Sequence, residues 1–165
     1  MTSGAAAGAP RFLADAMLGR LATWLRVLGY DAEYHRGGDA ALVARARAED
    51  RILLTRDTGL VRRRDLPRHL FVESDAVRTQ LAEVLTRLGL PAQPAAEPRC
   101  LRCNVRLEPR SRSEVEGRVP DFVWASQQRF WGCPRCRRLY WPGTHRRHMA
   151  ETIRSLAAVL DRGEG

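Results

Sequence analysis

The stretch "RILLTRD", residues 51–57, places a carboxylate at the point where a short buried strand reaches the surface. Residues 52–54 are all large and apolar, which is typical of a strand covered on both faces. The apolar run ends at Thr55, and Asp57 follows two positions later. A single aspartate in a loop can simply start a turn, so its meaning depends on whether other carboxylates reach the same edge.

Strands and helices are expected to alternate on both sides of this stretch. The most regular helix covers 17–28, where apolar residues recur with i, i+3, i+4, i+7 spacing before Gly29 as a C-cap. Strands are expected at 11–15, 30–34, 51–55 and 69–74, and further helices at 40–50, 60–64 and 75–90. This alternation with short connections predicts an α/β fold in which helices flank a parallel sheet.

Four aspartates are expected at one edge of this sheet. Asp15 and Asp57 follow the first and third strands, while Asp39 and Asp75 open the helices after the second and fourth. Ligands of such sheets bind at the carboxyl ends of the strands. Clustered carboxylates repel one another unless cations neutralise them, and their hard oxygen ligands suit Mg²⁺ or Mn²⁺. The pattern predicts a catalytic metal site for phosphodiester hydrolysis, oriented by the hydroxyl of Thr55.

Each of these carboxylates also has a purely structural explanation. Asp39 can cap its helix as readily as it can bind a metal ion, and Asp75 fits a helix cap better than a ligand. Asp15 lies between a strand and a helix, where a cap is again a sufficient explanation. The nuclease interpretation therefore depends on the four side chains arriving together.

The charged residues exclude several classes of enzyme. All 28 basic residues are arginine, the chain contains no lysine, and the formal net charge is +9. Without lysine there is no P-loop, no Schiff base and no phosphorylated receiver site. No G-x-G-x-x-G follows a strand, so a dinucleotide fold is unsupported. Guanidinium groups suit phosphate, so nucleic acid is the leading partner class and an anionic membrane surface a weaker alternative.

Two C-x-x-C pairs indicate a second, smaller module. The pairs "CLRC" at 100–103 and "CPRC" at 133–136 follow a stretch rich in proline and alanine at 91–99, which is typical of a linker. Two such pairs complete a tetrahedral four-sulfur zinc site with no open position, so its role would be structural. Two disulfides are the alternative, but the chain shows no secretion signal. The predicted zinc ligands are Cys100, Cys103, Cys133 and Cys136.

A basic surface is expected beside the second cysteine pair. Its arginines are Arg137, Arg138, Arg146 and Arg147. His145 and His148 either join this surface or replace cysteine ligands. The aromatic residues between these arginines are Trp131, Tyr140 and Trp141. They either stack on bases or fill a small core.

The chain resembles a known ribonuclease family. The motifs that carry the resemblance are "FLADAMLGRLATWLRVLGYDAEY", "RILLTRD", "RCLRCNVRL" and "FWGCPRCRRLYWPGTH". They are similar to the PIN-like family called the Mut-seven C-terminal domain, over roughly residues 11–150. The resemblance implies a PIN-like α/β domain, a zinc ribbon and metal-dependent ribonuclease activity. It implies metal-site roles for Asp15, Asp39 and Asp57, with Asp75 as a further candidate, and phosphate contacts for Arg20 and Arg26 of "LGRLATWLR".

Together these features predict a cytoplasmic ribonuclease that uses Mg²⁺ or Mn²⁺ and grips RNA with a zinc ribbon. No stretch is apolar enough to span a membrane, and the N-terminus lacks the features of a signal peptide. The expected parts are a disordered tail (1–10), a PIN-like domain (11–90), a linker (91–98), a zinc ribbon (99–150) and a C-terminal helix with its tail (151–165). The alternatives are a non-catalytic adaptor that binds RNA or the ribosome, and a toxin-like PIN protein.

Overall fold

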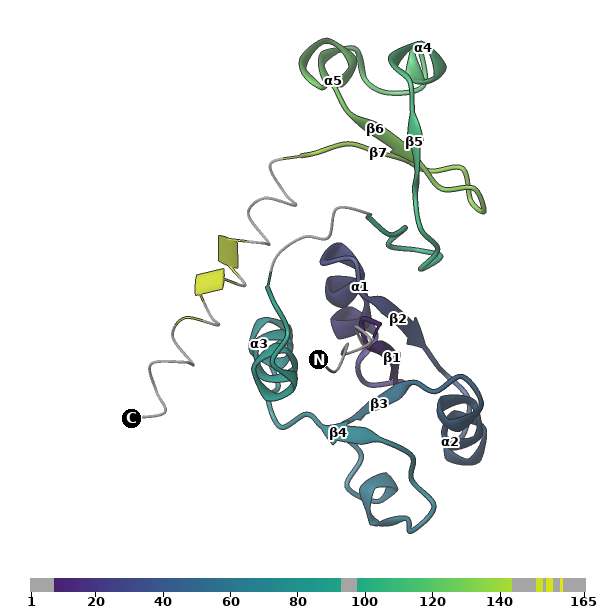
Figure 1. The fold of residues 1–165 in the computed structure, drawn as a ribbon, viewed down its shortest axis with the longest axis vertical. Helices are drawn as coiled ribbons and strands as arrows, with labels where there is room; N and C mark the ends of the chain where they lie inside the picture. The colour runs from purple at the N-terminus through teal and green to yellow at the C-terminus, as the bar shows by residue number, and fades with distance from the viewer. Residues whose placement is uncertain (1–7, 93–97, 144–150, 153, 156–157, 159–165) are drawn as a thin grey trace, which may run out of the picture.

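A parallel sheet forms the N-terminal part of the protein (Figure 1). The computed structural model describes residues 8–92, 98–143, 151–152, 154–155 and 158. The four strands of this sheet are β1 (Arg11–Ala14), β2 (Asp31–Tyr34), β3 (Ile52–Thr55) and β4 (His69–Phe71). They are arranged in the order β2-β1-β3-β4, with every neighbouring pair parallel. The expected α/β class with a parallel sheet is confirmed.

Helices cover both faces of the sheet. They are α1 (Gly19–Val27), α2 (Asp39–Ala48), the 3₁₀ helix η1 (Leu60–Arg62) and α3 (Val77–Leu88). Phe12 and Leu54 belong to a core cluster that includes α1 and α3 residues, whereas Leu13 and Leu53 pack with α2 and η1. Side chains of a strand alternate between its two faces, and here both faces are buried. This burial explains why residues 52–54 are apolar without alternation.

The first helix begins two residues later than expected. Helix α1 begins at Gly19, and Met17 is 66% exposed instead of lying on the buried face. The N–H of Met17 is bonded to Asp15 Oδ1, so the chain turns before it enters the helix. At the other end, Gly29 has a φ of 88°, the left-handed conformation expected just beyond a helix.

Neither Asp39 nor Asp75 is an N-cap, which corrects the capping predictions. Gly38 is the N-cap of α2, and Asp39 is the first residue of the helix, where its charge still favours the helix dipole. Ala76 is the N-cap of α3, and the carboxylate of Asp75 pairs with Arg56 instead.

A three-stranded antiparallel sheet forms the centre of the second module. Its strands are β5 (Glu108–Arg110), β6 (Phe130–Gly132) and β7 (Leu139–Tyr140), in that order. Two short helices, α4 (Arg112–Val115) and α5 (Asp121–Ser126), connect β5 to β6. Their buried residues pack against Phe130, which gives the module an apolar core of its own. The fold matches the expectation of a small zinc-ribbon-like module after the α/β part.

The last described residues, 151–152, 154–155 and 158, are helical. Most of the predicted linker and most of the predicted N-terminal tail lie outside the described residues. Within the described part of the chain, none of the helices has the length and apolar character needed to span a membrane.

Candidate functional site

Asp15 lies at the carboxyl end of β1 and is held in place by three donors. Its side chain is buried, with only 5% of the residue exposed. Oδ1 accepts the N–H of Met17 at 2.9 Å, and Oδ2 accepts the N–H of Arg56 at 3.1 Å. The hydroxyl of Thr55 also donates to Oδ2. The carboxylate is therefore fixed by its own loop and by the neighbouring strand β3.

Thr55 connects Asp15 to Asp57. The residue is fully buried at the end of β3, and its Oγ1 accepts the N–H of Asp57 at 3.0 Å while donating to Asp15. Asp57 is exposed, and its Oδ1 accepts the N–H groups of Gly59 and Leu60 at 2.7 and 3.1 Å. Asp57 thus does start a turn, the one that leads into η1, and it is the backbone N–H of Asp57, not its carboxylate, that is bonded to Thr55. We call Asp15, Thr55 and Asp57 the acidic edge.

The other two aspartates lie at the same end of the sheet but are not joined to this group. Asp39 is exposed at the first turn of α2, which follows β2. The side chain of Asp75 is 96% exposed, and the guanidinium of Arg56 is bonded to it and to the carbonyls of Glu73 and Ser74. Sequence reasoning did not single out Arg56, although its place inside "RILLTRD" put it at the edge.

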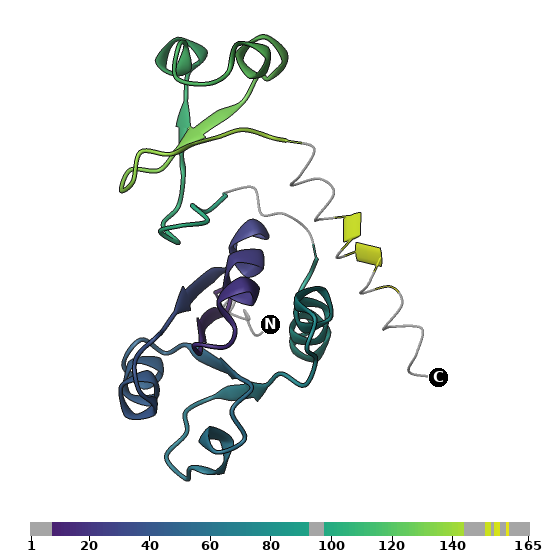
Figure 2. The ribbon, with the colours of Figure 1, turned by 180° about the vertical axis from the view of Figure 1, so that it is seen from behind.

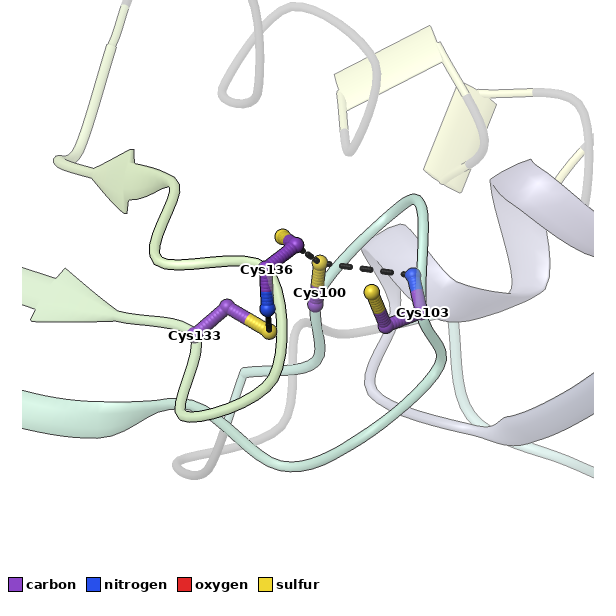
Figure 3. Close-up of side chains that lie close together, drawn as sticks. All are labelled: Cys100, Cys103, Cys133 and Cys136. Atoms are coloured by element: carbon purple, nitrogen blue, oxygen red, sulfur yellow. Dashed lines mark hydrogen bonds between the residues drawn. The ribbon is translucent and has the colours of Figure 1, made fainter.

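Four cysteine sulfurs converge in the second module (Figure 3). Their Sγ atoms all lie within 4.8 Å of one another, and all four thiols are free. Cys100 Sγ and Cys136 Sγ are 3.7 Å apart. Zinc–sulfur bonds of about 2.3 Å in a tetrahedron place two sulfurs about 3.8 Å apart, whereas a disulfide needs about 2.05 Å. The cluster can hold a metal ion such as zinc.

The two C-x-x-C pairs fold in the same way. The N–H of Asn104 donates to Cys100 O and the N–H of Arg137 to Cys133 O, each at 2.9 Å. Asn104 and Arg137 hold equivalent positions just after the pairs, with φ of 63° and 62°. In each pair, the N–H of the second cysteine points to the sulfur of the first at 3.4 Å. Donors aimed at a sulfur stabilise a thiolate, the form that binds metal.

Tyr140 adds a further contact to the cluster. Its hydroxyl lies 3.1 Å from Cys100 Sγ and accepts the N–H of Leu101 at 3.3 Å. Burial opposes ionisation of Cys100, but hydrogen bonds from the Tyr140 hydroxyl and nearby N–H groups prevail and lower its pKa to about 6. Among the described residues, three or more metal-binding side chains come close enough together to share an ion only at these cysteines. The carboxylates at the sheet edge do not form such a group.

The family model of the Mut7-C RNAse domain matches residues 10–153. The chain belongs to this family. No curated protein and no solved structure matches it. Ribonuclease-like function and RNA as the partner are what this family indicates, in line with the resemblance seen in the sequence.

The Mut7-C match spans the parallel sheet and the cysteine module, which are in direct contact. Figure 2 shows the chain entering the cysteine module beside the end of α1 and the strand β2. Asn104 Oδ1 accepts the N–H of Ala32 on β2 at 3.0 Å, and its Nδ2 donates to Asp31 and Glu33 at 2.7 and 2.9 Å. Asn104 is 3% exposed, so all of its side-chain hydrogen bonds are made within the protein.

Arg26 completes this contact. Its Nε donates to Ala32 O at 2.7 Å, and its Nη1 donates to Leu101 O at 2.8 Å. The residue is 8% exposed, and burial lowers the pKa of its guanidinium below the ordinary value. The contacts favour a structural role over the phosphate contact that the family resemblance implied. Arg20, the other arginine of that stretch, is exposed near the start of α1.

Of the predicted basic surface, Arg137 and Arg138 are exposed beside the second cysteine pair. Arg146, Arg147, His145 and His148 lie outside the described residues. Trp131 and Tyr140 pack partly buried against the cysteine cluster, and Trp141 packs against the core around Phe130. This packing favours the core interpretation of the three aromatic residues.

Proposed function

We propose that this Mut7-C protein is a metal-dependent ribonuclease that hydrolyses RNA phosphodiester bonds at the acidic edge. The observation that carries the proposal is the Asp15–Thr55–Asp57 group at the carboxyl ends of adjacent strands β1 and β3. This is the part of a parallel sheet where ligands bind. The family match supplies the substrate class, RNA.

The available side chains suit a hard cation. Asp15 and Asp57 would hold Mg²⁺ or Mn²⁺ with carboxylate oxygens, and Asp39 would approach from α2. Such an ion polarises a phosphate and makes an activated water available near neutral pH. The protein's side chains would position the ion. The carboxylate of Asp15 suits this role because three hydrogen-bond donors already fix its orientation. Thr55 acts through Asp15 and is therefore a positioning residue.

Arginines near the edge would contact the RNA backbone. Arg20 is exposed on α1, which begins a few residues after Asp15. Arg56 and Asp75 form an ion pair beside the edge, which would orient the arginine toward a phosphate. In this proposal Asp75 acts through Arg56, outside the metal site.

The cysteine module would hold one structural zinc and contribute to RNA binding. Four cysteine ligands leave no position for a substrate or water, so the zinc would stabilise the module only. Unpaired cysteines arranged for metal suit a reducing compartment, which is consistent with a cytoplasmic protein.

A non-catalytic RNA-binding adaptor is the second candidate. It is favoured by one observation: within the described part of the chain, the carboxylates of the sheet edge do not converge as the cysteines do. In that case the cysteine module would do the binding, and the acidic edge would only build the turn before η1.

The two candidates differ in what replacing Asp57 does. Asp57→Asn should abolish cleavage of a mixed RNA population in Mg²⁺ and in Mn²⁺, while RNA binding persists or tightens because repulsion of phosphate falls. Asp121→Asn makes the same chemical change at an exposed position of α5 and should cleave like wild type. If Asp57→Asn cleaves as fast as wild type, the adaptor function takes precedence.

A further inference from the structure

A pocket of about 460 Å³ lies on the cysteine module. It opens to the surface and is lined by β5, the region of α4, the second cysteine pair with the residue that follows it, and the adjoining ends of β6 and β7. Its polar lining consists of Glu108, Arg110, Glu114, Arg118 and Arg137. The remaining lining residues are Gly132, Cys133, Pro134 and Leu139. Sites of this volume take small molecules or one unit of a polymer.

Both carboxylates of the pocket already have partners. Glu108 Oε2 accepts Arg110 Nη2 at 3.0 Å, an ion pair within β5. Glu114 belongs to the capping box of α4, where its Oε2 accepts the N–H of Ser111 at 2.6 Å. Since the lining holds three arginines and two glutamates, its formal charge is +1. Both carboxylates are therefore engaged by groups of the module rather than free to face a ligand.

Gly132 creates the space for one of the arginines. A Cβ at this position would lie 2.7 Å from Arg110 Nε and 3.2 Å from Arg110 Cγ. The side chain of Arg110 therefore runs directly across the backbone of β6, which is paired with β5 at the Arg110↔Phe130 and Glu108↔Gly132 positions. Because a glycine lies under it, the guanidinium of Arg110 is held in the wall of the pocket.

Arg137 is held by the cysteine pair. Its backbone adopts the left-handed conformation and donates to Cys133 O at 2.9 Å, so the fold of the C-x-x-C turn sets its direction. Its side chain is exposed, and among the described residues it makes no ion pair. It is thus a positioned guanidinium that remains available to an anion.

We propose that this pocket binds a phosphate of single-stranded RNA together with the attached nucleoside. Arg137 and Arg110 contact the phosphate, because guanidinium groups match its oxygens in pairs. The nucleoside lies over the apolar part of the lining at Pro134 and Leu139. This inference rests on the proposed function for its polymer and adds a binding subsite outside the acidic edge.

The test is equilibrium binding of a short fluorescent single-stranded RNA, without added Mg²⁺ or Mn²⁺ so that no cleavage takes place. Arg137→Ala should raise the Kd about tenfold and lower the slope of log Kd against log salt by about one. Arg135→Ala is the matched control, since Arg135 lies in the same cysteine pair, is exposed and does not line the pocket. It should change the Kd less than twofold. Equal effects of the two variants would overturn the proposal.

Gly132→Ala tests the pocket without removing a charge. The added methyl group should displace the side chain of Arg110 and weaken RNA binding severalfold, with unchanged zinc content as the control for folding.

Adenosine monophosphate at millimolar concentration should displace the RNA, whereas adenosine should not. Equal displacement by both compounds would contradict phosphate recognition. If Asp57→Asn abolishes cleavage but Arg137→Ala binds RNA like wild type, the pocket fails and the nuclease stands. If instead Arg137→Ala weakens RNA binding and Asp57→Asn cleaves like wild type, the proposal for the pocket stands and the proposal of nuclease activity fails.

Discussion

Asn104 Oδ1 accepts the N–H of Ala32 at 3.0 Å, across a sequence separation of 72 residues. This bond joins the first cysteine pair to β2 of the parallel sheet. Asn104 has a left-handed φ of 63° and gives both amide protons to Asp31 and Glu33. The fold of the cysteine pair therefore decides whether this side chain reaches the α/β part. The hydrogen bond between Asn104 and Ala32 thus ties the stability of the parallel sheet to that of the cysteine module.

Replacing Asn104 should destabilise both modules. Asn104→Ala leaves the N–H of Ala32 without its partner and removes one donor from each of Asp31 and Glu33, at a cost of about 2–3 kcal/mol in the free energy of unfolding by urea. Asn104→Gly removes the same side chain but suits the left-handed backbone, so it should lose less. A loss confined to the cysteine module, as seen by hydrogen exchange, would show that the bond to β2 does not contribute.

Removing zinc should weaken the parallel sheet as well as the cysteine module. Freshly purified protein should contain one zinc per chain by metal analysis, because four cysteine sulfurs converge at one point. After chelation, amide exchange at Ala32 should accelerate, since Asn104 no longer has a fixed backbone to hold it against β2. Exchange in β4, on the far side of the sheet, serves as the internal reference. Unchanged exchange at Ala32 in zinc-free protein would contradict this link.

Thr55 can be tested with an isosteric change. Thr55→Val keeps the shape but removes the hydroxyl that joins Asp15 to Asp57. Cleavage should fall at least about tenfold because Asp15 loses a positioning donor, with a stability loss of about 1–2 kcal/mol. Thr55→Ser retains the hydroxyl and should restore most of the activity. Equal activity of the valine and serine variants would show that the hydroxyl has no catalytic consequence.

Substitutions at Arg26 and Arg20 should show that Arg26 stabilises the fold and that Arg20 binds RNA. Arg26→Gln should lower the free energy of unfolding by about 2–3 kcal/mol, because the guanidinium bonds to Ala32 O and Leu101 O are buried. Arg20→Gln, at an exposed position, should change stability by less than about 0.5 kcal/mol but reduce RNA affinity. The measurements are urea unfolding and RNA binding of the same samples. A stable Arg26→Gln with a reduced salt slope would restore the phosphate role implied by the resemblance.

Asp31 should contribute to stability at neutral pH but not in acid. Burial opposes its ionisation, yet hydrogen bonds from Arg51 and Asn104 outweigh this and lower its pKa below the ordinary value of an aspartate. A carboxyl whose pKa is lower in the folded state stabilises the protein above the unfolded value and loses that contribution as the pH falls through the folded value. Between pH 7 and 3, wild type should therefore lose more unfolding free energy than Asp31→Asn. Asp121→Asn should follow wild type, and loss of zinc in acid is common to all three proteins.

The strands and the acidic edge could be predicted because their signals are local. The apolar run at 52–54, the periodic helix before Gly29 and the two C-x-x-C pairs each carry their meaning within a few residues. That Asp15 and Asp57 lie at one edge followed from the parallel topology alone, whereas the hydrogen bonds of Thr55 to the Asp15 carboxylate and to the Asp57 backbone could be seen only in the structure.

The remaining features depend on partners that are distant in the sequence. Arg26 looks like an ordinary helix arginine until Leu101 O is found beside it, 75 residues away. Asn104 follows a cysteine pair, and no sequence motif around it predicts its contact with β2. The cap prediction for Asp75 failed for a related reason, since its carboxylate pairs with Arg56 rather than with the N-terminus of α3.

The covering of Ala32 also bears on how the outer strand of the sheet is kept from pairing with a second molecule. Strand β2 is the outer strand of its sheet, and the N–H and C=O of Ala32 are taken by Asn104 and Arg26. An outer strand with free backbone groups is a template on which a second molecule can add a strand. A cell short of zinc would release Asn104 and open this template. The zinc-bound cysteine module would therefore protect the outer strand from aggregation. The risk of aggregation would be greatest during synthesis, before Cys133 and Cys136 have emerged to complete the metal site.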